Sequence, residues 1–509
     1  MKTLRLILGD QLNIKHSWFK EINEDVLYCM FEIKQEATYV KQHIQKIAGF
    51  FGAMRDFSSQ LQEKGHNIIY YKINDKNNSH SFKNNILQIA EERDIKNFEY
   101  QYPDEYRINE ELLTCASKLK IASKVVSSEH FYTEREELSV FFKDKKQTVM
   151  ETFYQYMRKK HQVLMENNKP VGGKWNYDKS NRKKWKEDSF IPLPYEIKHD
   201  VSEILAEVNG VGIETFGNIN DTFFNYPLNR EEALGQLNYF VKELLPLFGD
   251  YQDAMHDREV YLYHSKLSFA LNIKLITPKE VVDKVEKSYY KNNTIGISQA
   301  EGFIRQILGW REFMRGMYWK LMPTFKKTNF FGHQNALPDF FWTGKTKMNC
   351  VKNCLKNSLD NSYAHHIQRL MVLGNLALLL EVDPEEVDKW YLGVYIDAVE
   401  WVQLPNTRGM SQYADGGLIA TKPYVSSANY IDKMSNYCSD CSYDKKDKIS
   451  TKACPFNSLY WNFLATKQEE LKKNRRMFMM FNLLNKMDSD LLMSLKSRAN
   501  SIINSPDNY

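Results

Sequence analysis

A metal could bind to four cysteines whose spacing is C-x87-C-x2-C-x12-C. They are Cys350, Cys438, Cys441 and Cys454. A close C-x-x-C pair with two further thiols can form a tetrahedral sulfur site for zinc or for iron. The spacing does not choose between these metals, and a redox-active Cys438–Cys441 pair with two core thiols is an alternative. Cys354 lies one helical turn after Cys350 and competes with it for the first ligand position.

Aromatic and polar side chains are combined in two further segments that could hold a ligand or move a proton. The segment 301–319 has a helical period, and Gln306 lies one turn before Trp310. Amide and guanidinium groups beside tryptophan suit a flat polar ligand, whereas the apolar stripe alone is typical of a core helix. The adjacent His365 and His366 can place one ring in a pocket and the other on its rim, which suits proton transfer near neutral pH. Structural packing of this pair is the alternative.

A strongly basic segment, 158–186, could contact nucleic acid. It contains ten Lys or Arg against two acidic residues, so it carries +8, whereas the whole chain carries +5. Its glycine pair at 172–173 and its interleaved Trp175, Tyr177 and Trp185 predict a flexible loop that touches phosphates and stacks on bases. A solvated charged linker is the alternative interpretation.

Hydrophobic periodicity predicts the elements that must position these residues. In the first 130 residues, short apolar runs alternate with helical patterns, which predicts a Rossmann-like α/β domain with a parallel sheet. The expected strands are 4–8, 26–31, 68–73, 98–100 and 124–126, and the expected helices are 37–62, 82–94 and 108–119. The first strand runs into Gly9-Asp10-Gln11 without a G-x-G-x-x-G or Walker A motif, so dinucleotide binding of the usual kind is not supported.

Beyond this domain the pattern first becomes irregular and then helical. A helix is expected over 148–160, and after Tyr226 helical periods dominate to the C-terminus. We therefore predict an α/β domain over 1–133, a long linker with the basic loop over 134–225, and a mostly α-helical domain over 226–509.

Composition indicates a soluble protein of several domains. The chain has 509 residues, of which 43% are hydrophobic and 26% are charged. Its seven cysteines are too sparse for a secreted disulfide scaffold, and no apolar stretch reaches the roughly 20 residues that span a bilayer. We expect a cytoplasmic protein without a signal peptide.

Long motifs of the chain resemble the cryptochrome/photolyase family. They are LILGDQL, EATYV, PVGGKWNYD, EGFIRQILGWREFMRG, FWTGKTKMNC, YAHHIQRLM, LPNTRGMSQYADGG, KPYVSSANYI and ACPFNSLYW, and they cover nearly the whole chain. Within the family, the resemblance is to the prokaryotic iron–sulfur (6-4) photolyases and related bacterial cryptochromes. It implies FAD in the helical domain, an antenna chromophore on the α/β domain, usually 6,7-dimethyl-8-ribityllumazine, and a [4Fe–4S] cluster.

The resemblance also assigns roles to individual residues. The cluster ligands would be Cys350, Cys438, Cys441 and Cys454, without Cys354. The FAD contacts would be Ser265, Leu267, Ser268, Gln306, Trp310, Arg311, Arg369, Asp397, Gln403 and Asn406. Gln403 falls near flavin N5, where many relatives carry Glu. The antenna contacts would be Asp10, Gln11, Glu36 and Tyr39, and the electron-transfer residues would be Trp342, Trp390 and Tyr391.

By resemblance, the protein is expected to repair (6-4) photoproducts in DNA with light. His366, with His365 beside it, would supply a proton to the lesion after electron transfer from reduced FAD. In this context the basic segment is expected to contact UV-damaged DNA, with Arg182, Lys183 and Lys184 on phosphates. The protein would act as a monomer. The alternative is a cryptochrome-like blue-light photoreceptor without repair activity.

Overall fold

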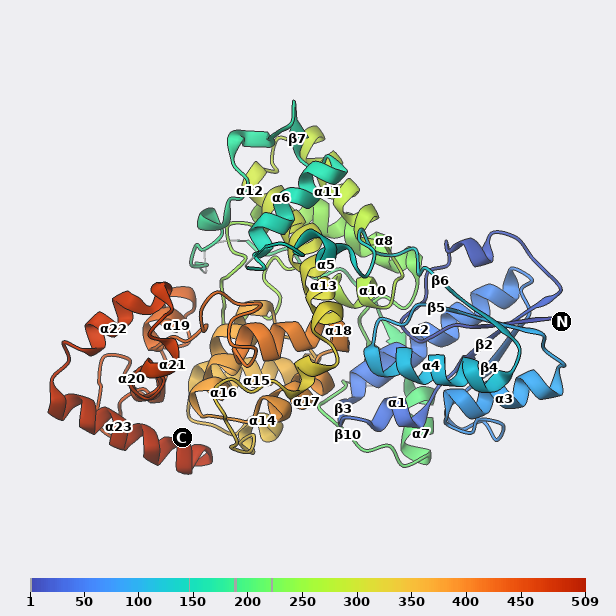
Figure 1. The fold of residues 1–509 in the computed structure, drawn as a ribbon. Coiled ribbons are helices and arrows are strands. Elements are labelled where there is room, and N and C mark those ends of the chain that lie inside the picture. Colours follow the sequence, from blue (N-terminus) through green and yellow to red (C-terminus); the bar gives the residue numbers. More distant parts are fainter. Residues whose placement is uncertain (1, 146, 187–189, 221–222) are drawn as a thin grey trace.

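Five parallel strands form the sheet of the N-terminal domain (Figure 1). We describe residues 2–145, 147–186, 190–220 and 223–509 in a computed structural model. The strands are β1 (Thr3–Leu6), β2 (Val26–Phe31), β4 (Ile68–Tyr71), β5 (Asn97–Gln101) and β6 (Ala122–Val126). Their order is β4-β2-β1-β5-β6, and every neighbouring pair is parallel. All five expected strands are present, with ends that differ by up to two residues from the expected ones.

The single helix expected over 37–62 is wrong, because residues 39–43 belong to no helix and divide this segment into two helices. The helices of this domain are α1 (Lys34–Thr38), α2 (Ile44–Glu63), α3 (Phe82–Glu92) and α4 (Tyr106–Leu119), and β3 (Gln42–His43) separates the first two. His43 has an extended backbone, and its Nδ1 accepts a hydrogen bond from the Gln45 amide at 3.1 Å. This cap satisfies a free donor of the first turn, so α2 begins at Ile44 as a new helix.

The segment 134–225 contains packed structure in addition to loops. It holds α5 (Glu137–Phe141), α6 (Met150–His161) and α7 (Ser202–Gly210), with short strand pairs between and after them. Phe153, Tyr154 and Met157 of α6 have no exposed surface, which shows that this helix belongs to the core. The segment then returns to the N-terminal domain, where Arg55 pairs with both Glu32 and Glu207.

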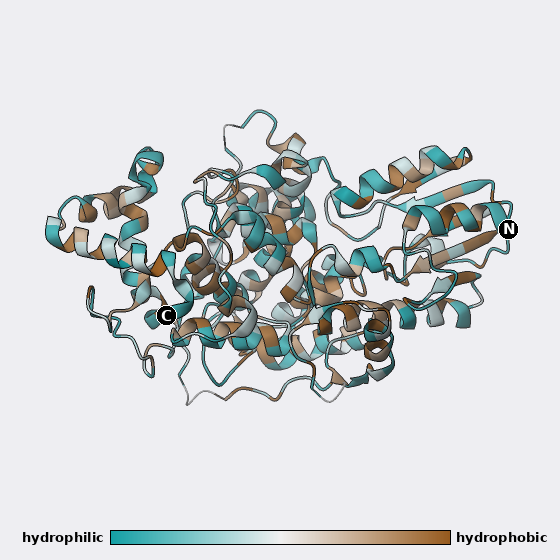
Figure 2. Cartoon of the chain, turned by 90° about the horizontal axis from the view of Figure 1, so that it is seen from below, coloured by the Kyte–Doolittle hydropathy of each residue, from teal (hydrophilic) through white to brown (hydrophobic). Residues whose placement is uncertain are grey.

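Helices account for nearly all regular structure after residue 226. The principal ones are α8 (Arg230–Tyr239), α11 (Pro278–Lys291), α12 (Ile297–Ile304), α13 (Glu312–Leu321), α15 (Asn349–Asn361), α17 (Pro384–Val394), α18 (Glu400–Leu404), α19 (Ala428–Met434), α20 (Pro455–Thr466), α22 (Phe478–Leu484) and α23 (Ser489–Asn504). Apolar residues gather on the inward faces of these helices, and hydrophilic ones on the outer faces (Figure 2). The N-terminal domain and α22–α23 lie at opposite ends of the molecule (Figure 1).

None of the described helices is both long enough and apolar enough to cross a membrane.

Candidate functional site

Segments of π-helix carry several of the expected site residues. Among the described residues, π-helices occur at 240–244, 305–311, 368–374 and 405–411. The last three contain Gln306, Trp310, Arg311, Arg369 and Asn406. One extra residue per turn is tolerated in helices mainly where it re-aims a functional side chain. A Cβ on Gly374 would lie 2.1 Å from Ser411 Oγ, so this glycine lets two of these segments approach closely.

Arg369 and Asp397 form a bidentate ion pair at the centre of the helical domain. Arg369 Nη1 and Nη2 donate to the two Asp397 oxygens at 3.0 and 3.3 Å, and the guanidinium lies 3.7 Å from the centre of the Tyr395 ring. The Arg369 side chain is 16% exposed and the Asp397 side chain is 14% exposed. Burial disfavours the charge of Arg369, but Asp397 outweighs it and the pKa of Arg369 is raised. The pair presents a fixed polar surface to a ligand.

Lys266 is a second cation in this region, and it has no acidic partner. Its ammonium lies 4.3 Å from the ring centres of both Tyr226 and Tyr261, and it forms no ion pair with the part of the chain that the structure describes. Loss of hydration lowers its pKa from 10.5 to about 7. A bound anion would supply the missing partner. The flanking Ser265 and Ser268 are partly exposed, whereas Leu267 is buried.

The two histidines differ in exposure. His365 is buried, and neither of its ring nitrogens has a hydrogen-bond partner among the described residues. It stacks on His264 with ring centres 4.6 Å apart. His366 is exposed at the surface. The surrounding protein restricts the hydration of its ring and Arg369 repels a positive charge, so that its pKa is lowered to about 4. One ring therefore is packed and the other is accessible.

Two of the three basic side chains that were expected on phosphates pair with carboxylates, and the third bonds to a backbone carbonyl. Arg182 pairs with Asp178 and lies 3.9 Å from Asp253. Lys183 Nζ lies 2.8 Å from Asp250, and Lys184 Nζ donates to the Asp432 carbonyl at 3.2 Å. All three side chains are exposed. Exposed ion pairs contribute at most about 1 kcal/mol, so a DNA phosphate can replace these carboxylates.

Two side chains of the basic segment, Arg158 and Trp185, are buried in the protein, so the expected contacts with phosphates and bases do not include them. Arg158 has no exposed surface, and its guanidinium donates to the carbonyls of Val163, Leu164 and Trp175. Trp185 is buried edge-on against His256. These side chains fix the loop to the protein, and its exposed lysines and arginines remain for a partner.

Two of the three expected electron-transfer residues lie together beside Arg369, and the third lies at the surface. Trp342 is 37% exposed, whereas Trp390 and Tyr391 are buried. The indole of Trp390 donates to the Phe341 carbonyl at 3.1 Å, and its ring centre lies 5.3 Å from that of Tyr391. The Tyr391 hydroxyl donates to the Arg369 carbonyl at 2.7 Å. The Trp390 and Tyr391 rings thus lead to the central ion pair, whereas the Trp342 ring packs edge-on against Phe216 with ring centres 5.1 Å apart.

The four expected cysteine ligands line one small cavity. Cys350 lies in the first turn of α15, Cys454 precedes α20, and Cys438 and Cys441 lie in the loop after α19; all four border this space. Cys354 does not border it and is buried one turn further along α15. Within the described ranges, no three His, Cys, Asp or Glu side chains form a group that could hold a single metal ion.

A cavity of about 170 Å³ lies where the N-terminal domain meets the helical domain. It opens at the carboxyl ends of β1, β2 and β5, the position where parallel sheets bind ligands. Its acidic lining is Asp10, Glu36, Asp104, Glu105 and Glu400, and aromatic side chains including Tyr39 and Trp401 form its walls. Three of the four residues expected to contact the antenna therefore border it. Gln11 does not, because its amide bonds to the backbone of Leu8, Gln101 and Tyr102.

Burial and neighbouring charges shift the pKa values of ionisable side chains that line this cavity. Burial, aided by Glu400, raises the pKa of Glu105 to about 8 against the opposing effect of Arg107. Burial lowers the pKa of Lys46, the lysine that lines the cavity, to about 8. Glu36 is held by two hydrogen bonds from Arg107 at 2.8 and 2.7 Å. The cavity therefore combines an apolar wall with several hydrogen-bond acceptors.

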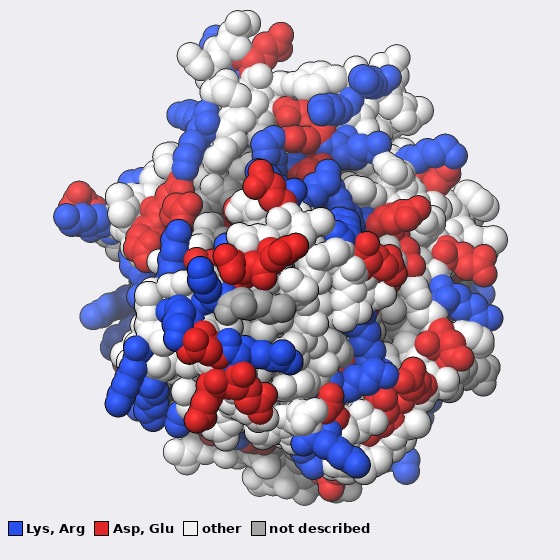
Figure 3. All heavy atoms as spheres, turned by 90° about the vertical axis from the view of Figure 1, so that its right-hand side faces the viewer, with Lys and Arg blue, Asp and Glu red and all other residues white. Residues whose placement is uncertain are grey.

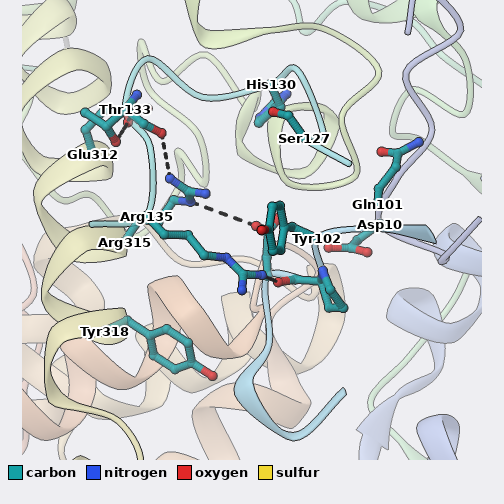
Figure 4. Close-up of polar contacts among 12 residues, drawn as sticks. Asp10, Gln101, Tyr102, Ser127, His130, Thr133, Arg135, Glu312, Arg315 and Tyr318 are labelled. Carbon is teal, nitrogen blue, oxygen red and sulfur yellow. Dashed lines mark hydrogen bonds and ion pairs between the residues drawn. The ribbon is translucent and has the colours of Figure 1, made fainter. Parts of the chain in front are cut away.

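A polar network fixes the two domains beside this cavity (Figure 4). Arg315 of α13 donates to the Thr133 carbonyl at 2.8 Å, and the Thr133 hydroxyl donates to Glu312 at 2.6 Å. Arg135 donates to the Pro103 carbonyl. Since these partners are largely buried, the segment after β6 is bound to the helical domain with little freedom. On the end of the molecule formed by the N-terminal domain, positive and negative side chains are interspersed (Figure 3).

Two other expected FAD contacts, Arg311 and Gln403, differ in their hydrogen bonds within the protein. Arg311 donates to Asn272 and to the Leu271 carbonyl, and it lies over the Trp401 ring. Asn272 in turn donates to the Asp397 carbonyl at 2.6 Å, which links Arg311 to the central ion pair. The Gln403 side chain is buried and forms no hydrogen bond with the described residues. Its amide is therefore available to a ligand.

Sequence reasoning missed Lys266 and the tyrosines of the 424–430 segment. Burial raises the pKa of Tyr430, the nearby acidic Asp253 and Asp178 add to this, and Arg182 opposes it. Lys266 stands inside HSKLSF, and its alternation with the two serines was the only signal that it belonged to the same site.

The chain matches a family model over part of its length and a known relative over all of it. A family model described as deoxyribodipyrimidine photo-lyase-related protein matches residues 5–224. The chain is 38% identical to the (6-4) photolyase of Agrobacterium fabrum over 517 residues, which covers 100% of both proteins. A bacterial class III photolyase from Agrobacterium tumefaciens has a similar fold, with a TM-score of 0.59, 13% identity and coverage of 100% and 98% of the two chains. A Synechocystis cryptochrome has a TM-score of 0.54, 14% identity and coverage of 92% and 94%.

Proposed function

The chain belongs to the (6-4) photolyase family, and on this basis we propose that it repairs pyrimidine–pyrimidone (6-4) photoproducts in DNA with blue light. The full-length similarity to a curated (6-4) photolyase carries this conclusion. The exposed His366 beside a buried, stacked His365 supports it, because such repair needs a proton donor that the damaged base can reach.

The residues around Arg369 fit the FAD that the family implies. Lys266 is a cation without an acidic partner in the described chain, and the hydroxyls of Ser265 and Ser268 flank it, so these three side chains would bind the diphosphate. Arg369 and Asp397 would hold the isoalloxazine side, and Gln403 would offer its amide there. When bound and reduced, FAD supplies the photoexcited electron for repair.

His366 would hold and deliver the proton. Its pKa of about 4 leaves the ring neutral at pH 7 in the protein alone. Phosphates of bound DNA and an anionic cofactor nearby would favour the imidazolium and raise this pKa. His365 positions its neighbour through its stack on His264, whose ring nitrogens lie 3.0 and 3.1 Å from two backbone carbonyl oxygens. Arg182, Lys183 and Lys184 would exchange their carboxylate and carbonyl partners for phosphates, which holds the rotated lesion at this histidine.

We also propose that Cys350, Cys438, Cys441 and Cys454 bind a [4Fe–4S] cluster. Four thiolates around one zinc ion would lie roughly 4 Å apart, given Zn–S bonds of about 2.3 Å. The four thiols share a cavity without forming a group that fits a single ion, and this arrangement favours a larger centre.

The interdomain cavity is the proposed site of the antenna. A lumazine ring would lie between its aromatic walls, and the hydroxyls of a ribityl chain would donate to its carboxylates, including Asp10 and Glu36. The chromophore released by denaturing the purified protein, identified by mass and absorption, tests this assignment.

Repair itself is tested with an oligonucleotide that contains one (6-4) photoproduct. Reduced, flavin-loaded protein under blue light should restore two pyrimidines, measured by mass spectrometry after digestion. The dark reaction and the variant His366→Ala should restore none. Flavin-loaded protein that restores nothing in any flavin redox state would show that the chain is not a photolyase and would favour a photoreceptor.

A further inference from the structure

A group of exposed cations lies outside the basic segment, at the start of α22. It consists of Lys422, Lys473, Arg475 and Arg476, which we call the C-terminal basic patch. All four side chains are exposed, and none forms an ion pair with the residues that the structure describes. Unpaired exposed cations so close together repel one another, which is a cost unless a polyanion binds them.

The patch is fixed to the body of the helical domain. Met477, Phe481 and Leu484 of this region are buried, so the other face of the helix is anchored in the core. The Asn474 side chain accepts a hydrogen bond from the Arg476 amide at 3.1 Å and donates to the Thr421 carbonyl at 3.1 Å. The second bond holds the turn before α22 beside the loop that leads to Tyr424. The cations therefore have a defined position.

The patch continues the surface where Arg182 lies. Burial raises the pKa of Tyr424, Asp178 adds to this, and both Arg476 and Arg182 oppose it. A direct contact links the basic segment to α19 (Ala428–Met434), because Lys184 Nζ donates to the Asp432 carbonyl at 3.2 Å. The patch residue Lys422 precedes Tyr424 by two positions, and α19 begins four residues after Tyr424. Cations thus extend from the proposed phosphate contacts toward the C-terminal end.

We propose that the C-terminal basic patch binds the phosphate backbone of the DNA arm on one side of the lesion. This inference rests on the proposed function, because the repair site defines where the lesion lies. The basic side chains extend beyond the lesion site, so an anionic partner that contacts all of them must be a long polyanion. A continuous nucleic acid strand is such a partner. The patch contacts only backbone, so it adds affinity without adding sequence preference.

The experiment measures DNA binding in the dark. The variant Lys473→Ala/Arg475→Ala/Arg476→Ala should weaken binding and reduce the slope of log K against log salt by about 1 for each lost phosphate contact. The matched control, Lys118→Ala/Lys120→Ala/Lys124→Ala, removes the same charge from exposed positions of the N-terminal domain and should leave the slope near that of the unmodified protein.

The position of the arm is tested with lesion oligonucleotides of unequal flanks. Shortening the DNA on one particular side should remove the difference between the patch variant and the unmodified protein, whereas shortening the other side should keep it. Equal salt slopes for the patch variant and the control would overturn the proposal. Because binding is measured without light, a failure of repair would contradict the proposed function alone.

Discussion

Tyr437 connects the four-cysteine cavity with the proposed catalytic histidines. Its ring borders the cavity and is 1% exposed. Its hydroxyl accepts a hydrogen bond from Gln368 Nε2 at 3.0 Å, and Gln368 Oε1 accepts one from the His365 amide at 3.1 Å. Gln368 is itself 1% exposed, so water cannot replace a lost partner. The phenol therefore orients the amide that holds the His365 backbone.

The change Tyr437→Phe removes the hydroxyl and keeps the ring. A buried Gln368 donor then has no partner, which costs about 1–3 kcal/mol of folding free energy. The amide can regain a partner only by rotating away from the His365 backbone. We expect lower stability together with slower repair, while the absorption of the cysteine-bound cofactor is retained because all four thiols remain.

Chemical unfolding and single-turnover repair measure the two effects. The matched control is Tyr443→Phe, since Tyr443 borders the same cavity but its hydroxyl forms no hydrogen bond within the described chain. The control should be close to the unmodified protein in both assays. Equal stability and equal repair rates for the two variants would refute the reasoning. A loss of stability without any change in repair would refute the link to His365.

Other predictions follow from single contacts. Lys183→Ala combined with Lys184→Ala should weaken DNA binding and flatten its salt dependence; unchanged binding would show that the segment is a solvated linker. Lys266→Met should lower flavin affinity, measured by retention of FAD on dilution, whereas full retention would show that this cation does not bind the diphosphate. Cys441→Ala should remove broad absorption near 400 nm, and an unchanged iron content would contradict its role as a ligand. The pKa of His43 is lowered from 6.5 to about 4 by burial, so the unfolded chain binds a proton first as pH falls, and stability is lost between these values by up to about 3 kcal/mol. His43→Gln should reduce this loss of stability in urea unfolding at pH 7 and pH 4.5, and identical pH dependence would contradict the assignment.

Strand β2 shows most clearly why the sequence predicted the sheet, because it is buried on both faces. Val26–Phe31 is apolar at every position, and the structure buries all six residues. Such continuous apolar runs are typical of buried parallel strands. They do not alternate between apolar and polar residues, but the ends of the run show where the strand begins and ends. The helix break at residues 39–43 was missed because it depends on a histidine cap, and His43 is also bonded to the carbonyl of Leu359, far along the chain. Local pattern does not contain that partner.

The partners of charged side chains were the hardest feature to predict, because these partners are often distant in sequence. Arg158 counted as a cation of the basic segment, yet three backbone carbonyls satisfy it in the core. Lys266 drew no notice among 69 basic residues, yet it is a cation without an acidic partner beside two tyrosines. Composition treats these two side chains alike. Only the fold shows that the protein itself satisfies the first, whereas the second has no acidic partner among the described residues, and this difference is why we propose Lys266 as a ligand contact.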